Sequence, residues 1–230
     1  AHHWMSLRYS RRGDNKKAVE EIEKAVSLDP KSPIILFAAS MQYSQIGDIK
    51  KQKEFLQKTS EVSPGFQSVE IYHGNLLEIQ YRWEEAEKYY LDLLQSPNYM
   101  ENPTNENRGV LLFNLCLFYL KTNQLIKANN ILTTLINYTE SNSNKHDYTY
   151  HMIGHCYLLL ENYEKSTQFY TMSSDINPLD VINFSTLSES LTLEGKYNAA
   201  QEALKQSDIL IDEQTNREKM HNLPYLEFAR

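Results

Sequence analysis

The 230-residue sequence contains little glycine or proline, only seven of each. These numbers are too low for the frequent turns of an all-β fold, and no alternating run of Val, Ile and Thr bounded by turn residues is visible. The sequence also lacks a stretch of about 18 consecutive apolar residues, which a membrane helix requires. The composition therefore favours helices throughout, and we expect a soluble, cytoplasmic protein with no membrane partner.

Clustered positive charge is also absent. The net charge is −7 at pH 7, with 30 acidic against 23 basic residues, and Lys and Arg form no dense tract. Because a polyphosphate backbone is bound mainly through clustered cations, we expect this segment to bind no nucleic acid directly. Cysteine is equally scarce. Cys116 and Cys156 lie among apolar residues, which indicates buried thiols in a reducing compartment, although spacing alone leaves a disulfide open.

Motifs of the common catalytic sites are missing. The sequence has no phosphate-binding glycine loop and no Gly-x-Ser-x-Gly nucleophile motif, so we predict a protein that is not an enzyme and needs no cofactor. One pair of side chains could hold a metal, because His151 and His155 are spaced i, i+4 on one predicted helix. The pair lacks the Glu that follows the first His of a zinc protease, and no third ligand is evident. The alternative hypothesis of a metal-dependent or catalytic protein would rest on this histidine pair alone.

The sequence does contain a repeat of 34 residues. This interval separates Pro30 from Pro64, Gly13 from Gly47 and Tyr9 from Tyr43. One frame of helix A, turn and helix B accounts for all three pairs and extends to six repeats, at about 1–32, 33–66, 67–100, 109–142, 147–180 and 181–212. Polar insertions lie at 98–108 and 141–144, and a tail follows at 213–230. Six repeats exceed the roughly three that a stable stack needs.

Glycine has two predicted roles in this frame. Gly74 and Gly154 lie within helix A, where the missing side chain lets helix B of the same repeat approach closely. Gly13, Gly47 and Gly195 lie at the turn, where a left-handed residue ends helix A at little cost. The aromatic residues recur at fixed positions of the frame, including the start of helix B at Trp83 and Tyr197, and we interpret them as packing residues.

The pattern resembles the tetratricopeptide repeat across about residues 1–212, and Trp83-Glu84-Glu85-Ala86 through Tyr90 is its best single match. This resemblance implies an all-α fold, a right-handed α-solenoid of antiparallel helix pairs in which the A helices line the concave face. It also implies a C-terminal capping segment at 213–230, which Pro224 should interrupt. Individual repeats depart from the family pattern, because Gln52 and Ser166 stand where helix B normally has a small Ala.

Two helix A positions four residues apart face the same way and would line the concave groove. The groove residues are His3, Leu7, Phe37, Met41, Ile71, Asn75, Phe113, Leu117, His151, His155, Ser185 and Glu189. Because the middle of this groove is apolar and its ends are polar, we predict a scaffold that binds a partly apolar peptide or protein segment. The expected anchors are Phe37, Met41, Phe113 and Leu117. Alternatively, the groove packs against itself or against another domain of the same protein.

A second hypothesis is a sensory or regulatory module. Its basis is the stretch His2-His3-Trp4, followed by Leu28-Asp29-Pro30 and Ser32-Pro33-Ile34-Ile35. These residues look like repeats carried behind winged-helix DNA-binding or nucleotide-cyclase domains in bacterial regulators. The sequence opens without a start methionine, which leaves room for an upstream domain in the same chain.

Overall fold

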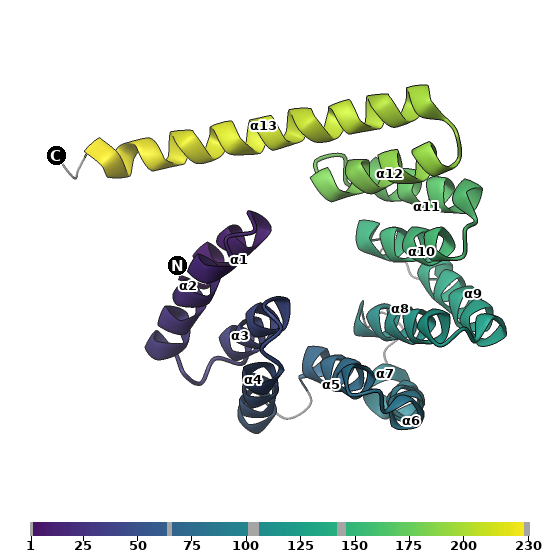
Figure 1. Cartoon of the computed structure of the whole chain (residues 1–230), viewed down its shortest axis with the longest axis horizontal. Helices are drawn as coiled ribbons and strands as arrows, with labels where there is room; N and C mark the ends of the chain where they lie inside the picture. The colour runs from purple at the N-terminus through teal and green to yellow at the C-terminus, as the bar shows by residue number, and fades with distance from the viewer. Residues whose placement is uncertain (1, 64–65, 101–105, 142–145, 228–230) are drawn as a thin grey trace. The chain divides into compact units, whose positions relative to one another are not determined.

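The computed structural model describes residues 2–63, 66–100, 106–141 and 146–227 (Figure 1). Within these ranges every regular element is an α-helix. None of the helices in the described ranges combines the length and the apolar character that crossing a bilayer demands. The chain divides into two compact halves, residues 1–97 and 98–230.

The helices follow one another in pairs. The N-terminal half contains α1 (His2–Arg11) with α2 (Asn15–Leu28), α3 (Pro33–Gln45) with α4 (Ile49–Val62), and α5 (Gln67–Ile79) with α6 (Trp83–Gln95). After the short α7 (Pro97–Met100), the C-terminal half contains α8 (Glu106–Lys121) with α9 (Leu125–Ser141), α10 (Asp147–Leu159) with α11 (Tyr163–Ile176), and α12 (Val181–Leu193) with α13 (Tyr197–Glu227).

Each half is built by the same rule. Three residues join the two helices of a pair, so the helices run antiparallel and pack on each other. The second helix of one pair then packs on the first helix of the next, as α2 does on α3 and α11 on α12. The predicted all-α solenoid of helix pairs is therefore confirmed.

The turn within each pair contains one residue with a left-handed backbone. Gly13, Gly47 and Gly195 have φ angles of 74°, 75° and 85°, which confirms their predicted role. The same turn position is left-handed without glycine at Tyr81, Asn123 and Glu161, where φ is 58°, 56° and 58°. The tertiary fold thus imposes this turn even at Tyr81 and Glu161, whose residue types do not favour a left-handed backbone.

The two helix A glycines lie directly under buried rings of helix B. A Cβ atom added to Gly74 would lie 2.2 Å from Cε1 of Tyr90, and one added to Gly154 would lie 2.9 Å from Cδ1 of Tyr170. Both tyrosines are fully buried. The predicted close approach of the paired helices at these glycines is therefore confirmed.

Two expectations from the sequence are wrong. The aromatic residues at the start of helix B are not all packing residues, because Trp83 is 38 % exposed and Tyr197 is 69 % exposed. The Trp83 ring lies against Tyr81 of the preceding turn, at a centroid distance of 5.8 Å. In addition, α13 continues past Pro224 to Glu227, because the backbone hydrogen bond that this proline removes lies close to the end of a long helix.

Candidate partner-binding face

In the C-terminal half, the predicted groove positions of three successive repeats lie side by side. Phe113 and Leu117 lie on α8, His151 and His155 on α10, and Glu189 on α12. We call these five residues the α8–α10–α12 strip. The Phe113 and His155 rings are 6.1 Å apart between centroids and tilted by 59°. Glu189 is close enough for its charge to act on the His155 imidazole.

Burial keeps both histidines of the strip neutral near pH 7. The pKa of His155 lies below its ordinary value of 6.5 because the half-buried ring is desolvated, and the nearby Glu189 carboxylate offsets only part of this effect. The pKa of His151 is lowered by the same desolvation and by its neighbour His155, while a hydrogen bond with Asn183 acts in the opposite direction. The strip therefore has an aromatic end, a neutral imidazole centre and an acidic end.

Two polar atoms beneath the strip lack a hydrogen-bond partner within the described residues. They are Nδ1 of His151 and the hydroxyl oxygen of Tyr170, whose rings lie 5.1 Å apart. An unmet buried polar atom costs about 1–3 kcal/mol. The repeat frame predicts only packing for its aromatic residues, Tyr170 among them, and predicts no role for Asn183, because neither residue occupies a groove position of the frame.

The histidine pair has aromatic rather than metal-ligating neighbours. His151 contacts the ring of Tyr170, and His155 contacts the ring of Phe113. In the part of the chain that the structure describes, no group of three or more His, Cys, Asp or Glu residues is arranged to hold a metal ion.

In the N-terminal half, the expected groove residues pack more deeply. Phe37 on α3 makes T-shaped contacts with Phe66 and Tyr72, at centroid distances of 5.6 and 5.1 Å. Ile71 on α5 is only 3 % exposed. Its assignment to a partner-binding surface is therefore corrected, because helical spacing determines the direction of a side chain but not how deeply its neighbours cover it. Met41 remains half-buried and accessible.

The remaining N-terminal groove residues differ in their contacts. Asn75 accepts a hydrogen bond of 2.6 Å from the hydroxyl of Tyr90, so its amide oxygen is already engaged in the core of its own repeat. His3 stacks on the exposed Trp4, at a centroid distance of 5.5 Å. Leu7 is half-buried on α1.

The fold and the strip define a class of protein, the helical-repeat solenoid, which presents side chains from successive repeats in rows. The family model described as tetratricopeptide repeat matches residues 1–32 and 148–178. The chain therefore contains tetratricopeptide repeats at these residues, and its other helix pairs continue the same fold. Proteins of this family are in general interaction scaffolds that bind protein or peptide partners without catalysis.

Solved structures share this fold at low sequence identity. The structure of PilW, described as a widely conserved type IV pilus biogenesis factor, matches with a TM-score of 0.52 and 17 % identity, covering 88 % of each chain. BtubC from P. vanneervenii matches with a TM-score of 0.58 and 12 % identity, covering 88 % of this chain and 90 % of its own. No significant match is found among curated protein sequences.

Proposed function

We propose that this protein is an interaction scaffold whose α8–α10–α12 strip binds one segment of a partner protein. The observation that carries the proposal is the contact between Phe113 and His155, which joins the groove positions of neighbouring repeats into one surface. Glu189 of the next repeat extends the surface with an exposed carboxylate. The partner segment that fits this order of side chains has an apolar residue against Phe113 and Leu117 and a basic residue facing Glu189.

The energy available from the strip is moderate. Phe113 and Leu117 are only partly buried in the free protein, so covering them contributes on the order of 1–2 kcal/mol each. An exposed ion pair with Glu189 adds about 0.2–1 kcal/mol and mainly selects the orientation of the segment. In the N-terminal half, Phe37 and Met41 are the proposed anchors, and Met41 offers the more accessible side chain.

Panning a displayed peptide library against the protein tests the proposal, and fluorescence anisotropy then measures the affinity of selected peptides. We expect Phe113→Ala combined with Leu117→Ala to weaken binding by about tenfold or more, since each truncation removes apolar contact area. Ile126→Ala is the matched control, because Ile126 is an exposed apolar residue of α9 in the same half. Selected peptides that bind the double variant as tightly as the unmodified protein would contradict the assignment of this strip.

Charge reversal at Glu189 provides a second test. Peptides selected by the unmodified protein should contain a basic residue at a fixed distance from the apolar one, and Glu189→Lys should favour an acidic residue there instead. An unchanged preference would show that the segment does not extend to α12.

We also propose that the protein resides in the cytoplasm, where thiols remain reduced. The support is that Cys116 on α8 and Cys156 on α10 are both buried and free. A hydrogen bond with Cys116, together with burial, raises the pKa of the Cys156 thiol, so little reactive thiolate forms. Alkylation of denatured protein taken directly from its native cells should modify both thiols, and a disulfide at this pair would contradict the location.

A further inference from the structure

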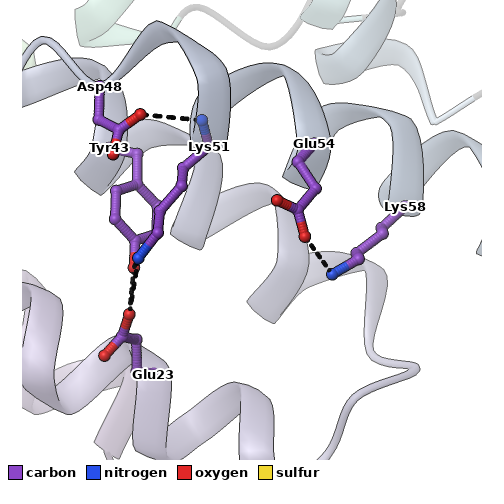
Figure 2. Close-up of polar contacts among 6 residues, drawn as sticks. All are labelled: Glu23, Tyr43, Asp48, Lys51, Glu54 and Lys58. Atoms are coloured by element: carbon purple, nitrogen blue, oxygen red, sulfur yellow. Dashed lines mark hydrogen bonds and ion pairs between the residues drawn. The ribbon is translucent and has the colours of Figure 1, made fainter.

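In the second repeat, one phenol ring fills the space between three helices. The hydroxyl of Tyr43 on α3 donates a hydrogen bond to Glu23 on α2 and accepts one of 2.9 Å from Nζ of Lys51 on α4 (Figure 2). The Tyr43 ring also stacks on Phe55 of α4, with centroids 5.5 Å apart and planes within 6° of parallel. Tyr43 is almost completely buried as a result.

The third repeat lacks this bridge. At the positions 34 residues further along the chain, Leu77 replaces Tyr43, Gln57 replaces Glu23 and Glu85 replaces Lys51. Tyr89 stands where the second repeat has Phe55. A leucine side chain is too short to reach from α5 to both neighbouring helices, so the space that Tyr43 fills in one repeat has no equivalent occupant in the next.

A cavity of about 710 Å³ lies at this place, between α4, α5 and α6. Its lining includes Gln57, Leu77 and Tyr89, which stand at the positions of the acceptor Glu23, of Tyr43 and of its stacking partner Phe55 in the preceding repeat. The volume lies in the range of small-ligand sites, roughly 300–1,000 Å³. In the described part of the chain, the ring of Tyr89 has one aromatic neighbour, the T-shaped Tyr90 at 6.5 Å, so no ring stacks on it face to face.

The neutral part of the lining consists of apolar and aromatic groups. Leu76 and Leu77 supply apolar surface. Burial lowers the pKa of His73 below its ordinary value, so the imidazole is neutral near pH 7. Burial, together with the charge of Glu70, raises the pKa of Tyr89 to about 12, so its phenol stays protonated.

Among the described residues, the charged side chains that line the cavity include one cation without an ion-pair partner. Arg82 is neutralised by Glu85 through hydrogen bonds of 2.8 and 2.5 Å, and Glu54 is neutralised by Lys58 at 2.7 Å. Lys53 also lines the cavity, and no carboxylate within the described residues pairs with its ammonium group. An anion beside Lys53 therefore meets a positive charge without a carboxylate partner, whereas the Glu70 carboxylate, which acts on His73 and Tyr89, disfavours an anion beside those two rings.

We propose that this cavity binds an aromatic ring that carries an anionic group, with the ring stacked on Tyr89 as Tyr43 is stacked on Phe55. The ring contributes its apolar area and the stacking interaction, and the anionic group interacts with Lys53. Two sources share this chemistry, a small aryl acid and a tyrosine side chain flanked by acidic residues in a partner polypeptide. The site is separate from the α8–α10–α12 strip and does not depend on the function proposed there.

Titration of the full chain with 4-hydroxyphenylacetate, followed by methyl NMR, tests the proposal. We expect ring-current shifts of the Leu76 and Leu77 methyl resonances and no shift at Leu191, the counterpart of Leu77 in the sixth repeat. Cyclohexylacetate has the same charge but no aromatic ring. It should bind at least about threefold more weakly than 4-hydroxyphenylacetate, because it cannot stack on Tyr89. A blocked Asp-Tyr-Asp peptide is the second arm, and the tighter of the two aromatic probes identifies the source.

Two substitutions make the test specific. Leu77→Tyr recreates the ring of the second repeat and should reduce binding of 4-hydroxyphenylacetate at least tenfold by occupying the cavity. Lys53→Ala should weaken binding by about threefold through loss of the charge contact. Lys50→Ala, which removes an exposed lysine of α4 outside the lining, should leave binding unchanged.

Several results would overturn the proposal. The first is that the Leu76 and Leu77 methyl resonances of the unmodified protein do not shift at millimolar probe. The second is an affinity for cyclohexylacetate equal to that for 4-hydroxyphenylacetate. The third is a folded Leu77→Tyr variant that binds the probe as tightly as the unmodified protein. If Leu77→Tyr does not fold, the methyl shifts of the unmodified protein and the comparison of Lys53→Ala with Lys50→Ala still decide the question.

Discussion

Substitution of Gly74 by alanine should be among the most damaging small changes in the molecule. The added Cβ would lie 2.2 Å from Cε1, 2.5 Å from Cζ and 2.8 Å from the hydroxyl oxygen of Tyr90. The ring cannot move aside easily, because it is fully buried and its hydroxyl lies within hydrogen-bond distance of the Asn75 amide oxygen, at 2.6 Å, and of the Glu78 carboxylate, at 2.7 Å. Alanine can therefore be accommodated only if the ring shifts or the two helices separate.

The expected cost follows from three contributions. Overpacking of a core costs about 1–3 kcal/mol, and disturbing the hydrogen bonds of Tyr90 adds roughly 1–2 kcal/mol. The higher helix propensity of alanine returns about 1 kcal/mol. We therefore expect Gly74→Ala to lower the free energy of unfolding by about 3 kcal/mol.

The other helix A glycines form a matched series. At Gly154 the added Cβ would lie 2.9 Å from Tyr170, and at Gly109 it would lie 3.1 Å from the half-buried Tyr138. We expect a cost of about 1 kcal/mol for Gly154→Ala and close to none for Gly109→Ala. Urea unfolding monitored by circular dichroism gives the three free energies, with constant m-values as the check for two-state behaviour.

A double-mutant cycle tests whether the clash with the Tyr90 ring causes the loss of stability in Gly74→Ala. Tyr90→Leu introduces the residue found at the corresponding position of the fourth repeat, Leu132, and removes the ring that the Cβ would strike. Gly74→Ala should then cost at least about 2 kcal/mol less in the Tyr90→Leu background. Equal costs in both backgrounds, or an unchanged stability of Gly74→Ala, would refute the steric explanation.

Three further predictions follow from the turns, the caps and the histidines. Glu161→Gly should raise the free energy of unfolding by about 0.5–1 kcal/mol, because φ is 58° there and glycine removes the strain of a left-handed residue; thermal unfolding measures the gain. Asp48→Ala should lower the free energy of unfolding, measured in urea, by about 1 kcal/mol, because the Asp48 carboxylate caps α4 by accepting a hydrogen bond of 3.0 Å from the Lys51 backbone amide. Asp29→Ala, at the end of α2, is the control and should leave the free energy of unfolding nearly unchanged. Burial lowers the pKa values of His151 and His155, so the unfolded chain binds protons more readily than the folded one; the associated stability is complete above pH 6.5 and is lost as the pH falls through the lowered values. Urea midpoints measured across this range should therefore depend less on pH in His155→Gln than in the unmodified protein, and identical profiles would argue against the buried His155.

The repeat and most of its local geometry can be predicted from the amino-acid sequence. The intervals from Gly13 to Gly47 and from Pro30 to Pro64 placed turns and helix ends, because these residues act through backbone conformation, which depends on near neighbours in the chain. Gly74 likewise indicated a close helix approach. Local sequence does not predict the left-handed backbone of Tyr81 and Glu161, because packing of the paired helices overrides the conformational preference of these residues.

The depth of burial of each side chain and the position of the cavity depend on the tertiary structure. Helical spacing assigned Ile71 and Phe113 to the same kind of surface, yet Ile71 lies in the core while Phe113 is partly exposed beside His155. The cavity beside Leu77 depends on side chains from three helices at once. The direction in which a side chain points follows from the period of its own helix. Its depth of burial, and the cavities left between side chains, follow from the combined packing of all neighbouring helices.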